Sequence, residues 1–283
     1  TNPKMTKVSH KNIDESLKPV IPLKFSSVSN RYNQLLLDFK GGYSVEFRAF
    51  NDGIAYRFIT NKKGMINVKN ETLQVNFPDN YLLHMQQSGS FKTAYEEEYT
   101  HLYSKEWKSS ASMALLPILI DTQKGSKILI GDRSVKILKE ADYIAQTSGK
   151  RNFPWRYFVI STEDSQLIEN TMSYRLAEKN ILEDTSWIKP GLASWEWWNG
   201  ATPYGPDVNF VAGCNLDTYK YFIDFAANYG IPYIIMDEGW AMSTRDPYTP
   251  NPAVDVHELI RYGKEKNVGI VLWLTWLTVC LLY

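Results

Sequence analysis

The sequence predicts two folds in one chain: an antiparallel β-sandwich over residues 1–184, followed by the first part of a (β/α)8 barrel over residues 185–283. Apolar residues alternate with period two up to about Asp184, as half-buried strands require. Beyond Trp187, apolar runs of strand length alternate with helical segments, which is typical of βαβ units with a parallel sheet. The 283 residues, 44% of them hydrophobic, suffice to bury more than one core.

The first half contains several short strand patterns. Every second residue is apolar in residues 43–49, and Ile54, Tyr56 and Phe58 repeat the alternation after the Asn-Asp-Gly turn at residues 51–53. The Asp-Gly step is a hairpin signal. Further strands are expected over residues 72–77, 115–121, 127–131 and 156–161. Many short strands of this kind predict a large β-sandwich, and we expect its amino-terminal part to be missing.

The second half begins with a strand predicted over residues 191–198, and a loop rich in Gly, Pro and Asn then leads to a helix. Asn215 or Asp217 can cap this helix, because their side chains accept hydrogen bonds from the first backbone N–H groups. Gly230 and Pro232 stop it in the expected way. The apolar residues expected on its buried face are Tyr219, Phe222, Ile223 and Ala226.

Two more strands complete the pattern, at residues 233–237 and 270–274, with a second helix between them. The apolar face of that helix contains Val256, Leu259, Ile260 and Gly263, and Asn267 with Gly269 ends it. Three parallel strands cannot close a barrel that needs eight. We therefore expect a truncated barrel, with a truncated or frameshifted apolar end at residues 278–283.

The overall composition favours a neutral partner. The 31 basic and 31 acidic residues cancel, so nothing favours nucleic acid or an anionic membrane surface. No run of about 18 apolar residues predicts a membrane span, and no signal peptide is visible at the amino terminus. Nine Trp and 18 Tyr offer flat rings that suit the apolar faces of sugars.

Acids and indoles gather where the three predicted barrel strands end. These ends read Trp-Glu-Trp-Trp-Asn (195–199), Asp-Glu-Gly-Trp (237–240) and Trp-Leu-Thr-Trp (273–276). In a parallel barrel, functional side chains lie at the carboxyl ends of strands. Carboxylates accept hydrogen bonds from vicinal hydroxyls, and indoles stack on the C–H face of a pyranose. The candidate substrate-binding residues are Asp237, Glu238, Trp240, Trp197, Trp198 and Trp276.

Within this set, Asp237 and Glu238 are the strongest candidates, because adjacent acids at a strand end repel each other unless a ligand, metal or base lies between them. We expect Trp195 and Trp273 to fill the barrel core instead. We expect Glu196 to pair with a neighbouring lysine or arginine.

A second acidic cluster, Tyr-Glu-Glu-Glu-Tyr at residues 95–99, lies in the sandwich half. Glu96 and Glu98 project to one side of an extended segment and offer hard oxygen ligands that suit calcium, although an acidic triplet is more often a solvated surface. The two cysteines and four histidines show no zinc spacing. No phosphate-binding glycine loop and no Gly-x-Ser-x-Gly elbow is present.

Five motifs resemble glycoside hydrolase family 97. In the barrel half these are residues 187–191 (Trp-Ile-Lys-Pro-Gly), 195–199 and 236–240 (Met-Asp-Glu-Gly-Trp). Residues 47–57 and the Pro-Trp-Arg at residues 154–156 are similar to the amino-terminal domain of that family. The resemblance covers the chain except for its last few residues.

The resemblance implies a β-super-sandwich joined to a (β/α)8 barrel, with a calcium ion that takes one ligand from the sandwich. Glu96 is the best match for that ligand and Glu98 is the alternative. The strand-end motifs are similar to the retaining branch, whose nucleophile is an Asp in a Lys-x-Asp-Phe-Met context on the fourth barrel strand, with a Glu as acid/base further on. Neither segment occurs here, so we expect the catalytic residues beyond residue 283 and none in this chain.

The function that the resemblance implies is that of a retaining exo-α-galactosidase acting on the non-reducing ends of oligosaccharides, of which this chain would be an inactive part. Asp237 and Glu238 resemble acids that bind galactose hydroxyls in related barrel enzymes. The alternatives are an α-glucosidase or β-L-arabinopyranosidase of the same family, or a non-catalytic carbohydrate-binding protein. The resemblance also implies a periplasmic or cell-surface location in a bacterium.

Overall fold

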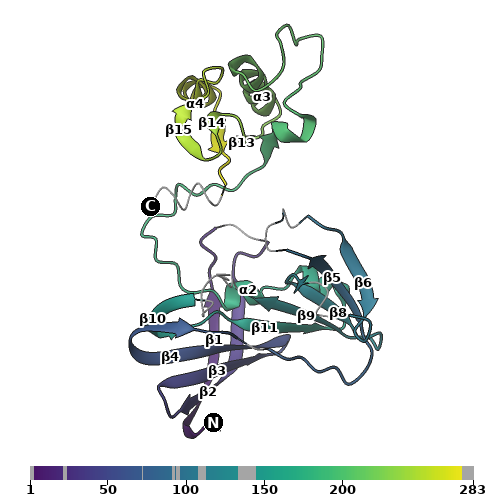
Figure 1. Cartoon of the computed structure of the whole chain (residues 1–283), viewed down its shortest axis with the longest axis vertical. Coiled ribbons are helices and arrows are strands. Elements are labelled where there is room, and N and C mark those ends of the chain that lie inside the picture. The colour runs from purple at the N-terminus through teal and green to yellow at the C-terminus, as the bar shows by residue number, and fades with distance from the viewer. Residues whose placement is uncertain are drawn as a thin grey trace. The chain divides into compact units, whose positions relative to one another are not determined.

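The computed structural model describes residues 3–21, 24–71, 73–90, 93, 96–107, 113–132 and 145–275 (Figure 1). The chain divides into two compact units, Thr1–Leu182 and Glu183–Tyr283. Most of the described secondary structure is β-strand, and the few helices are short. None of the described helices is long and apolar enough to cross a membrane.

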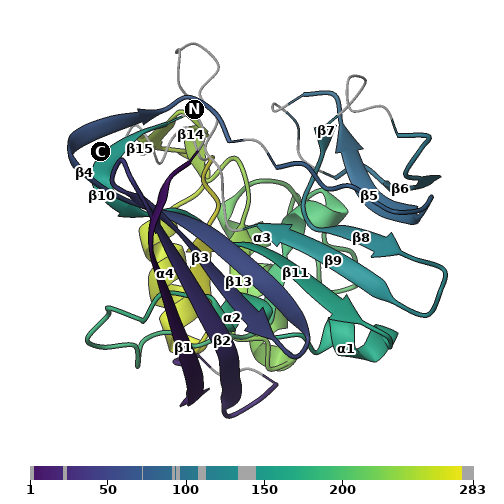
Figure 2. The ribbon, with the colours of Figure 1, turned by 90° about the horizontal axis from the view of Figure 1, so that it is seen from below.

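The first unit is built on one antiparallel sheet. Its 11 strands follow the order β1-β2-β3-β4-β11-β9-β8-β5-β6, with β10 paired to β4 and β7 to β5. Figure 2 shows β5 and β6 beyond β8 at one end of the sheet. The strands are β1 (Met5–Leu17), β2 (Val28–Phe39), β3 (Tyr43–Phe50), β4 (Gly53–Val68), β5 (Leu82–Ser88), β6 (Tyr99–Tyr103), β7 (Met113–Ala114), β8 (Ile118–Asp121), β9 (Lys127–Asp132), β10 (Ala145–Asn152) and β11 (Arg156–Ser161).

Each face of this sheet carries its own apolar core. Val159 and Phe158 are neighbours on β11 and therefore point to opposite faces. Val159 belongs to one core. That core also contains residues from the segment with two short helices, α1 (Asp164–Ile168) and α2 (Met172–Arg175). Phe158 packs against the second core. The buried residues are Phe50, Ala55, Trp155, Val159, Met172 and Leu176 on the first face, and Leu83, Met85, Ile120 and Ile130 on the second.

The strands predicted at residues 43–49, 127–131 and 156–161 are confirmed, and the strand expected from residue 115 begins only after Pro117. The strand predicted at residues 72–77 is wrong. Thr72 lies outside the described residues, and residues 73–77 pair with no described strand. Most of this segment is exposed, so water satisfies the backbone groups that a partner strand would otherwise bind.

A buried charged cluster lies on the face of β3 that the apolar alternation leaves polar. Hydrophobicity alone would place Phe47 inside, yet Phe47 is 40% exposed and Glu46 only 2%. The Glu46 carboxylate pairs with Arg48 Nε at 3.0 Å and Arg57 Nε at 2.8 Å. Both guanidinium groups lie 4.4 Å from the Trp155 ring, which gives the two cations a second favourable partner.

Replacing Glu46 with alanine is expected to destabilise the first unit by about 3–5 kcal/mol, because two largely buried guanidinium groups lose their shared carboxylate. Urea unfolding measures this free energy. The control is Asp14→Ala, which breaks an exposed pair with Arg31 and should cost about 0–1 kcal/mol. Equal losses in the two variants would contradict the assignment.

The second unit contains three parallel strands in the order β12 (Ala193–Trp195), β13 (Tyr233–Met236) and β16 (Gly269–Leu272). Helices α3 (Leu216–Asn228) and α4 (Val256–Glu265) follow β12 and β13 along the chain and pack against the strands. A hairpin of β14 (Ala241–Ser243) and β15 (Asp246–Pro250), which the sequence did not predict, lies between β13 and α4.

The predicted start and end of α3 are confirmed. Of the two possible caps, Asn215 is the residue whose side chain accepts a hydrogen bond from the backbone of Thr218, at 3.0 Å. Gly230 follows the helix in the left-handed conformation, at φ +67°, which glycine adopts without strain. The four predicted core residues of α3 are all buried.

The first predicted barrel strand, residues 191–198, is too long. Only Ala193–Trp195 is strand, and Glu196–Asn199 forms the 3-10 helix η1, which ends at Gly200 with φ +64°. The chain turns here because Glu196 folds inward to bind backbone and side-chain groups of neighbouring elements.

Candidate functional site

The carboxyl ends of β12, β13 and β16 meet at one edge of the parallel sheet. Trp195 lies beside Ile235, and Met236 lies beside Leu272, so the strands end almost level. The residues that follow them, among which are Glu196 and Asp237, are thereby brought to a common rim. We call this group of residues 195–199, 237–240 and 273 the strand-end rim.

Asp237 is held in a fixed orientation at this rim. Its Oδ2 accepts a hydrogen bond from the Trp195 indole N–H at 2.7 Å, and its Oδ1 accepts one from the Glu238 backbone N–H at 2.6 Å. The carboxylate is half-buried, and Glu238 beside it is exposed. Each carboxylate oxygen can accept further hydrogen bonds, so Asp237 presents a pre-oriented pair of acceptors.

Glu196 supports Asp237 from below. Its side chain is only 4% exposed, and its Oε1 accepts hydrogen bonds from the Asp237 backbone N–H at 2.8 Å and the Tyr219 hydroxyl at 2.9 Å. Its Oε2 is buried and has no hydrogen-bond partner in the described part of the chain. Burial raises the pKa of Glu196 and outweighs these two hydrogen bonds, which lower it.

The expectation that Glu196 pairs with a lysine or arginine is therefore wrong. No basic side chain of the described residues forms an ion pair with it. Its partners are two neutral groups, the backbone N–H of the residue directly after β13 and a hydroxyl on α3, and the identity of residue 196 alone could not reveal them.

The indoles of the rim form a connected group. The Trp195 ring stacks on Trp197 with centroids 5.7 Å apart and meets Trp198 edge-on at 5.9 Å. Trp197 is 54% exposed and Trp198 76%, so each ring is accessible to a ligand over part of its surface. Trp195 itself is only half-buried, and by bonding Asp237 it links the indoles to the acid.

Glu238 and Trp240 lie on the other side of the rim. Together with Trp273 they line a crevice of about 10 Å³, which has room for one water molecule at most. The Trp240 indole N–H donates to the Trp273 carbonyl at 3.0 Å. Trp276, also predicted to bind substrate, lies outside the described residues. The described rim is thus an open edge and does not enclose a sugar.

Sequence reasoning missed the support that α3 gives the rim. Tyr219 was predicted only as a core residue, and it is 1% exposed, but its hydroxyl also binds Glu196. Cys214 Sγ lies 3.7 Å from the same hydroxyl. A Cβ at Gly239, where φ is +113°, would come within 2.8 Å of that sulfur, so the rim turn requires glycine.

The calcium ligands predicted in the first unit, Glu96 and Glu98, are both exposed. Among the described residues, no group of three His, Cys, Asp or Glu side chains could hold a metal ion. Calcium also takes backbone carbonyls and waters as ligands, so the calcium site at Glu96 or Glu98 stays a prediction.

Comparison with known proteins identifies the family. Residues 1–179 match the Glycosyl-hydrolase 97 N-terminal family, and residues 197–282 match the Glycoside hydrolase 97 family. The chain belongs to glycoside hydrolase family 97. The family resemblance predicted from the five sequence motifs is thereby confirmed.

Two curated relatives carry galactosidase names. The chain is 34% identical over 322 residues to a retaining alpha-galactosidase of Bacteroides thetaiotaomicron, covering 96% of this chain and 48% of that protein. It is 26% identical to a probable retaining alpha-galactosidase of Streptomyces bingchenggensis, covering 86% and 40%. The chain thus spans less than half the length of these relatives.

Solved structures show the same fold. A family 97 enzyme of Pseudoalteromonas sp. strain K8, in complex with acarbose, matches 95% of this chain and 46% of that one with a TM-score of 0.75 at 23% identity. A beta-arabinopyranosidase matches 96% and 47% with a TM-score of 0.75 at 20% identity.

Glu196→Gln is expected to change the pH dependence of stability. Since the pKa of Glu196 is higher in the folded than in the unfolded state, the folded protein holds this proton more tightly, and stability falls as pH rises from the unfolded-state pKa through the folded-state pKa. The glutamine keeps the Oε1 acceptor and carries no titrating group. The variant should therefore gain stability relative to the parent as pH rises, measured by urea unfolding at several pH values.

Glu196→Ala serves as the matched variant, because it removes both the charge and the acceptor. It should cost about 1–3 kcal/mol for each buried donor left unpaired, the Tyr219 hydroxyl and the Asp237 N–H. A glutamine variant that tracks the parent at every pH would show that Glu196 does not titrate differently in the folded state.

Proposed function

We propose that this chain comprises the amino-terminal β-sandwich and the opening strands of the (β/α)8 barrel of a retaining exo-α-galactosidase. The observation that carries the proposal is the Asp237 carboxylate, oriented through both oxygens at the end of a parallel strand, beside the exposed Glu238. The 34% identity to a retaining alpha-galactosidase supports the same activity.

The rim suits a neutral hexose. The Asp237 and Glu238 carboxylates accept hydrogen bonds from sugar hydroxyls, and the exposed rings of Trp197 and Trp198 offer stacking surfaces to the C–H face. The Trp195 N–H already occupies one lone pair of the Asp237 carboxylate. A sugar hydroxyl must therefore donate to one of the remaining lone pairs. We propose that this geometry discriminates between orientations of vicinal hydroxyls, which would separate galactose from glucose because the two differ in configuration at C4.

We assign Asp237 and Glu238 to substrate binding and not to catalysis. Retaining hydrolysis needs two carboxyl groups about 5–5.5 Å apart across the scissile bond, one to attack the anomeric carbon and one to protonate the leaving oxygen. Asp237 is fixed by two hydrogen bonds and is adjacent in sequence to Glu238, an arrangement that serves recognition. The nucleophile and the acid/base are proposed to lie on later barrel strands.

The test is hydrolysis of an aryl α-galactoside by the protein expressed from its complete gene. Hydrolysis with retention is expected, with the α-anomer as first product by NMR. Asp237→Asn or Glu238→Gln should lower kcat/KM by about 10- to 100-fold, the effect of losing a hydrogen bond to a charged acceptor. Glu265→Gln, on the exposed end of α4, is the control and should leave kcat/KM unchanged.

A substrate panel decides between this and the other activities. If an α-glucoside or a β-L-arabinopyranoside is hydrolysed faster than the α-galactoside, that sugar is the substrate instead. The panel is informative because these sugars differ from galactose at C4 or C6. Saturable sugar binding with no turnover would indicate a non-catalytic carbohydrate-binding protein instead.

We also propose that the complete protein binds calcium through Glu96, or through Glu98, with the other ligands supplied elsewhere. Oxygen-only ligands and exposed carboxylates support this choice of ion. A chelator should abolish activity of the complete protein and added calcium should restore it. Glu96→Gln or Glu98→Gln should weaken calcium binding measured by calorimetry, whereas Glu97→Gln should not. Activity that is indifferent to the chelator would refute the proposal.

A periplasmic or cell-surface location in a bacterium is proposed on the family resemblance. Fractionation of the native host, followed by immunoblotting, would check it. Recovery in the cytoplasmic fraction would contradict it.

A further inference from the structure

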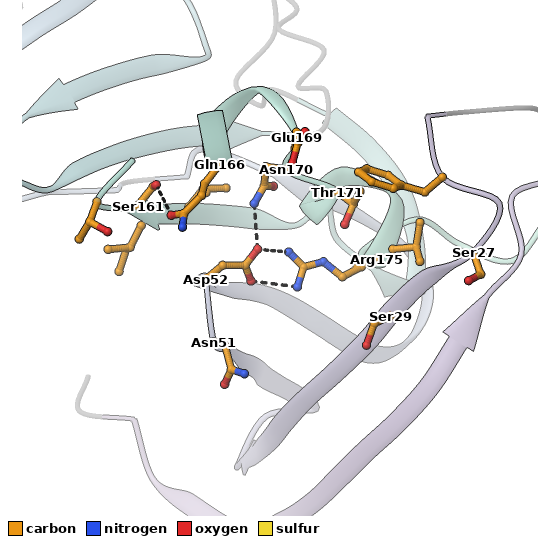
Figure 3. A pocket seen from close by; sticks show the side chains of 15 residues that line it. Ser27, Ser29, Asn51, Asp52, Ser161, Gln166, Glu169, Asn170, Thr171 and Arg175 are labelled. Carbon is orange, nitrogen blue, oxygen red and sulfur yellow. Dashed lines mark hydrogen bonds and ion pairs between the residues drawn. The ribbon is translucent and has the colours of Figure 1, made fainter. Parts of the chain in front are cut away.

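The first unit contains a cleft of its own, with a volume of about 660 Å³. This is within the range of about 300–1,000 Å³ found for small-molecule sites. Figure 3 shows that its lining comes from separate parts of the chain: the segment leading into β2, the turn between β3 and β4, the end of β11, and the α1–α2 segment. A cleft assembled from four distant segments exists only in the folded unit.

An oriented carboxylate lies at the base of this cleft. Asp52 accepts hydrogen bonds from Arg175 Nη1 and Asn170 Nδ2, both at 2.9 Å, and pairs with Arg175 Nη2 as well (Figure 3). Arg175 is 8% exposed and lies over the Phe50 ring, which fixes its guanidinium. The Asp52 side chain remains 39% exposed, so its oxygens can accept a ligand hydroxyl.

Both polar and apolar side chains surround the Asp52 carboxylate in the lining of the cleft. The Gln166 amide is oriented by the Ser161 hydroxyl, which donates to its Oε1 at 2.6 Å, and Asn51 is exposed at the edge of the cleft. Phe25 is 38% exposed and Ile160 47% exposed in the same lining. Amide, carboxylate and hydroxyl groups beside an open aromatic ring match a ligand that has hydroxyls on its edge and C–H groups on its face.

The charges of the described lining favour a neutral ligand over an anion or a metal ion. Its charged residues are Asp52, Glu169 and Arg175, two acids and one base, so the net charge is −1. Among the described lining residues Arg175 is the one base, and Asp52 already pairs with it, so this lining offers no unpaired cation to a phosphate or a carboxylate ligand. The described acids do not gather in a group of three that could hold a metal ion.

We propose that this cleft is a second, non-catalytic binding site for neutral oligosaccharides, with Asp52, Asn51 and Gln166 meeting the hydroxyls and Phe25 stacking on a sugar ring. The proposal goes beyond the function assigned to the strand-end rim, because every residue in it belongs to the first unit.

The experiment titrates the 283-residue chain with raffinose and with maltotriose, by calorimetry or by saturation-transfer NMR. Saturable binding is expected. Phe25→Ala should weaken it by about 2- to 10-fold, the usual worth of one stacked ring, and Asn51→Ala should also weaken it. Both side chains are exposed, so the variants should keep the fold, checked by circular dichroism. Phe58→Ala is the matched control, a ring 39% exposed outside the cleft, and should bind like the parent.

The same titration separates this site from the rim. Glu238→Gln should leave binding in the cleft unchanged even if it weakens turnover by the complete protein. Absence of saturable binding, binding lost in Glu238→Gln and retained in Phe25→Ala, or equal loss in Phe58→Ala would each overturn the proposal. Tighter binding of inorganic phosphate than of either sugar would overturn it as well.

Discussion

The strand-end rim depends on a single buried carboxylate. Glu196 Oε1 binds the first backbone N–H after β13 and the hydroxyl of a core tyrosine on α3, so one atom joins three elements of the second unit. Glu196 is also the first residue of η1, so these two hydrogen bonds anchor the start of the 3-10 helix that carries the exposed indoles. The hydrogen bond from the Asp237 N–H also fixes the backbone of Asp237, and this helps to orient the Asp237 carboxylate.

Both units therefore place a glutamate where hydrophobic pattern alone would not. Glu46 is balanced by two arginines that stack on Trp155, which makes it an ion-paired and charged centre. Within the described part of the chain Glu196 has neutral partners only, and burial raises its pKa. A buried acid that is paired with cations contributes rigidity to the fold. A buried acid without cations lowers the stability of the fold, and proteins retain it where its hydrogen bonds position other groups.

Periodicity in the sequence predicted much of the fold. Most of the period-two segments form antiparallel strands, residues 73–77 being the exception, and the cap at Asn215 and the stop at Gly230 set the limits of α3. The burial of Glu46 could not be predicted, because which face of a strand is covered depends on distant partners such as Trp155. The β14–β15 hairpin was missed because its residues show no clear alternation.

The candidate site was predicted in part. Position at a strand end predicted that Asp237 lies at the rim, and parallel strands do bring it beside Trp195 there. Its role in substrate binding stays a prediction. The roles of Glu196 and Tyr219 could not be predicted from the sequence. An acid and a tyrosine 23 residues apart show the same sequence pattern whether or not their side chains form a hydrogen bond. Trp276 lies outside the described residues, and the calcium role of Glu96 or Glu98 stays a prediction.

The most direct test is a crystal structure of the complete protein with galactose bound. Hydroxyls of the sugar are predicted to lie within about 2.5–3.0 Å of the Asp237 and Glu238 carboxylate oxygens, with one ring face against an indole of η1. A galactose bound in the barrel with water or protein side chains occupying both carboxylates would contradict the account.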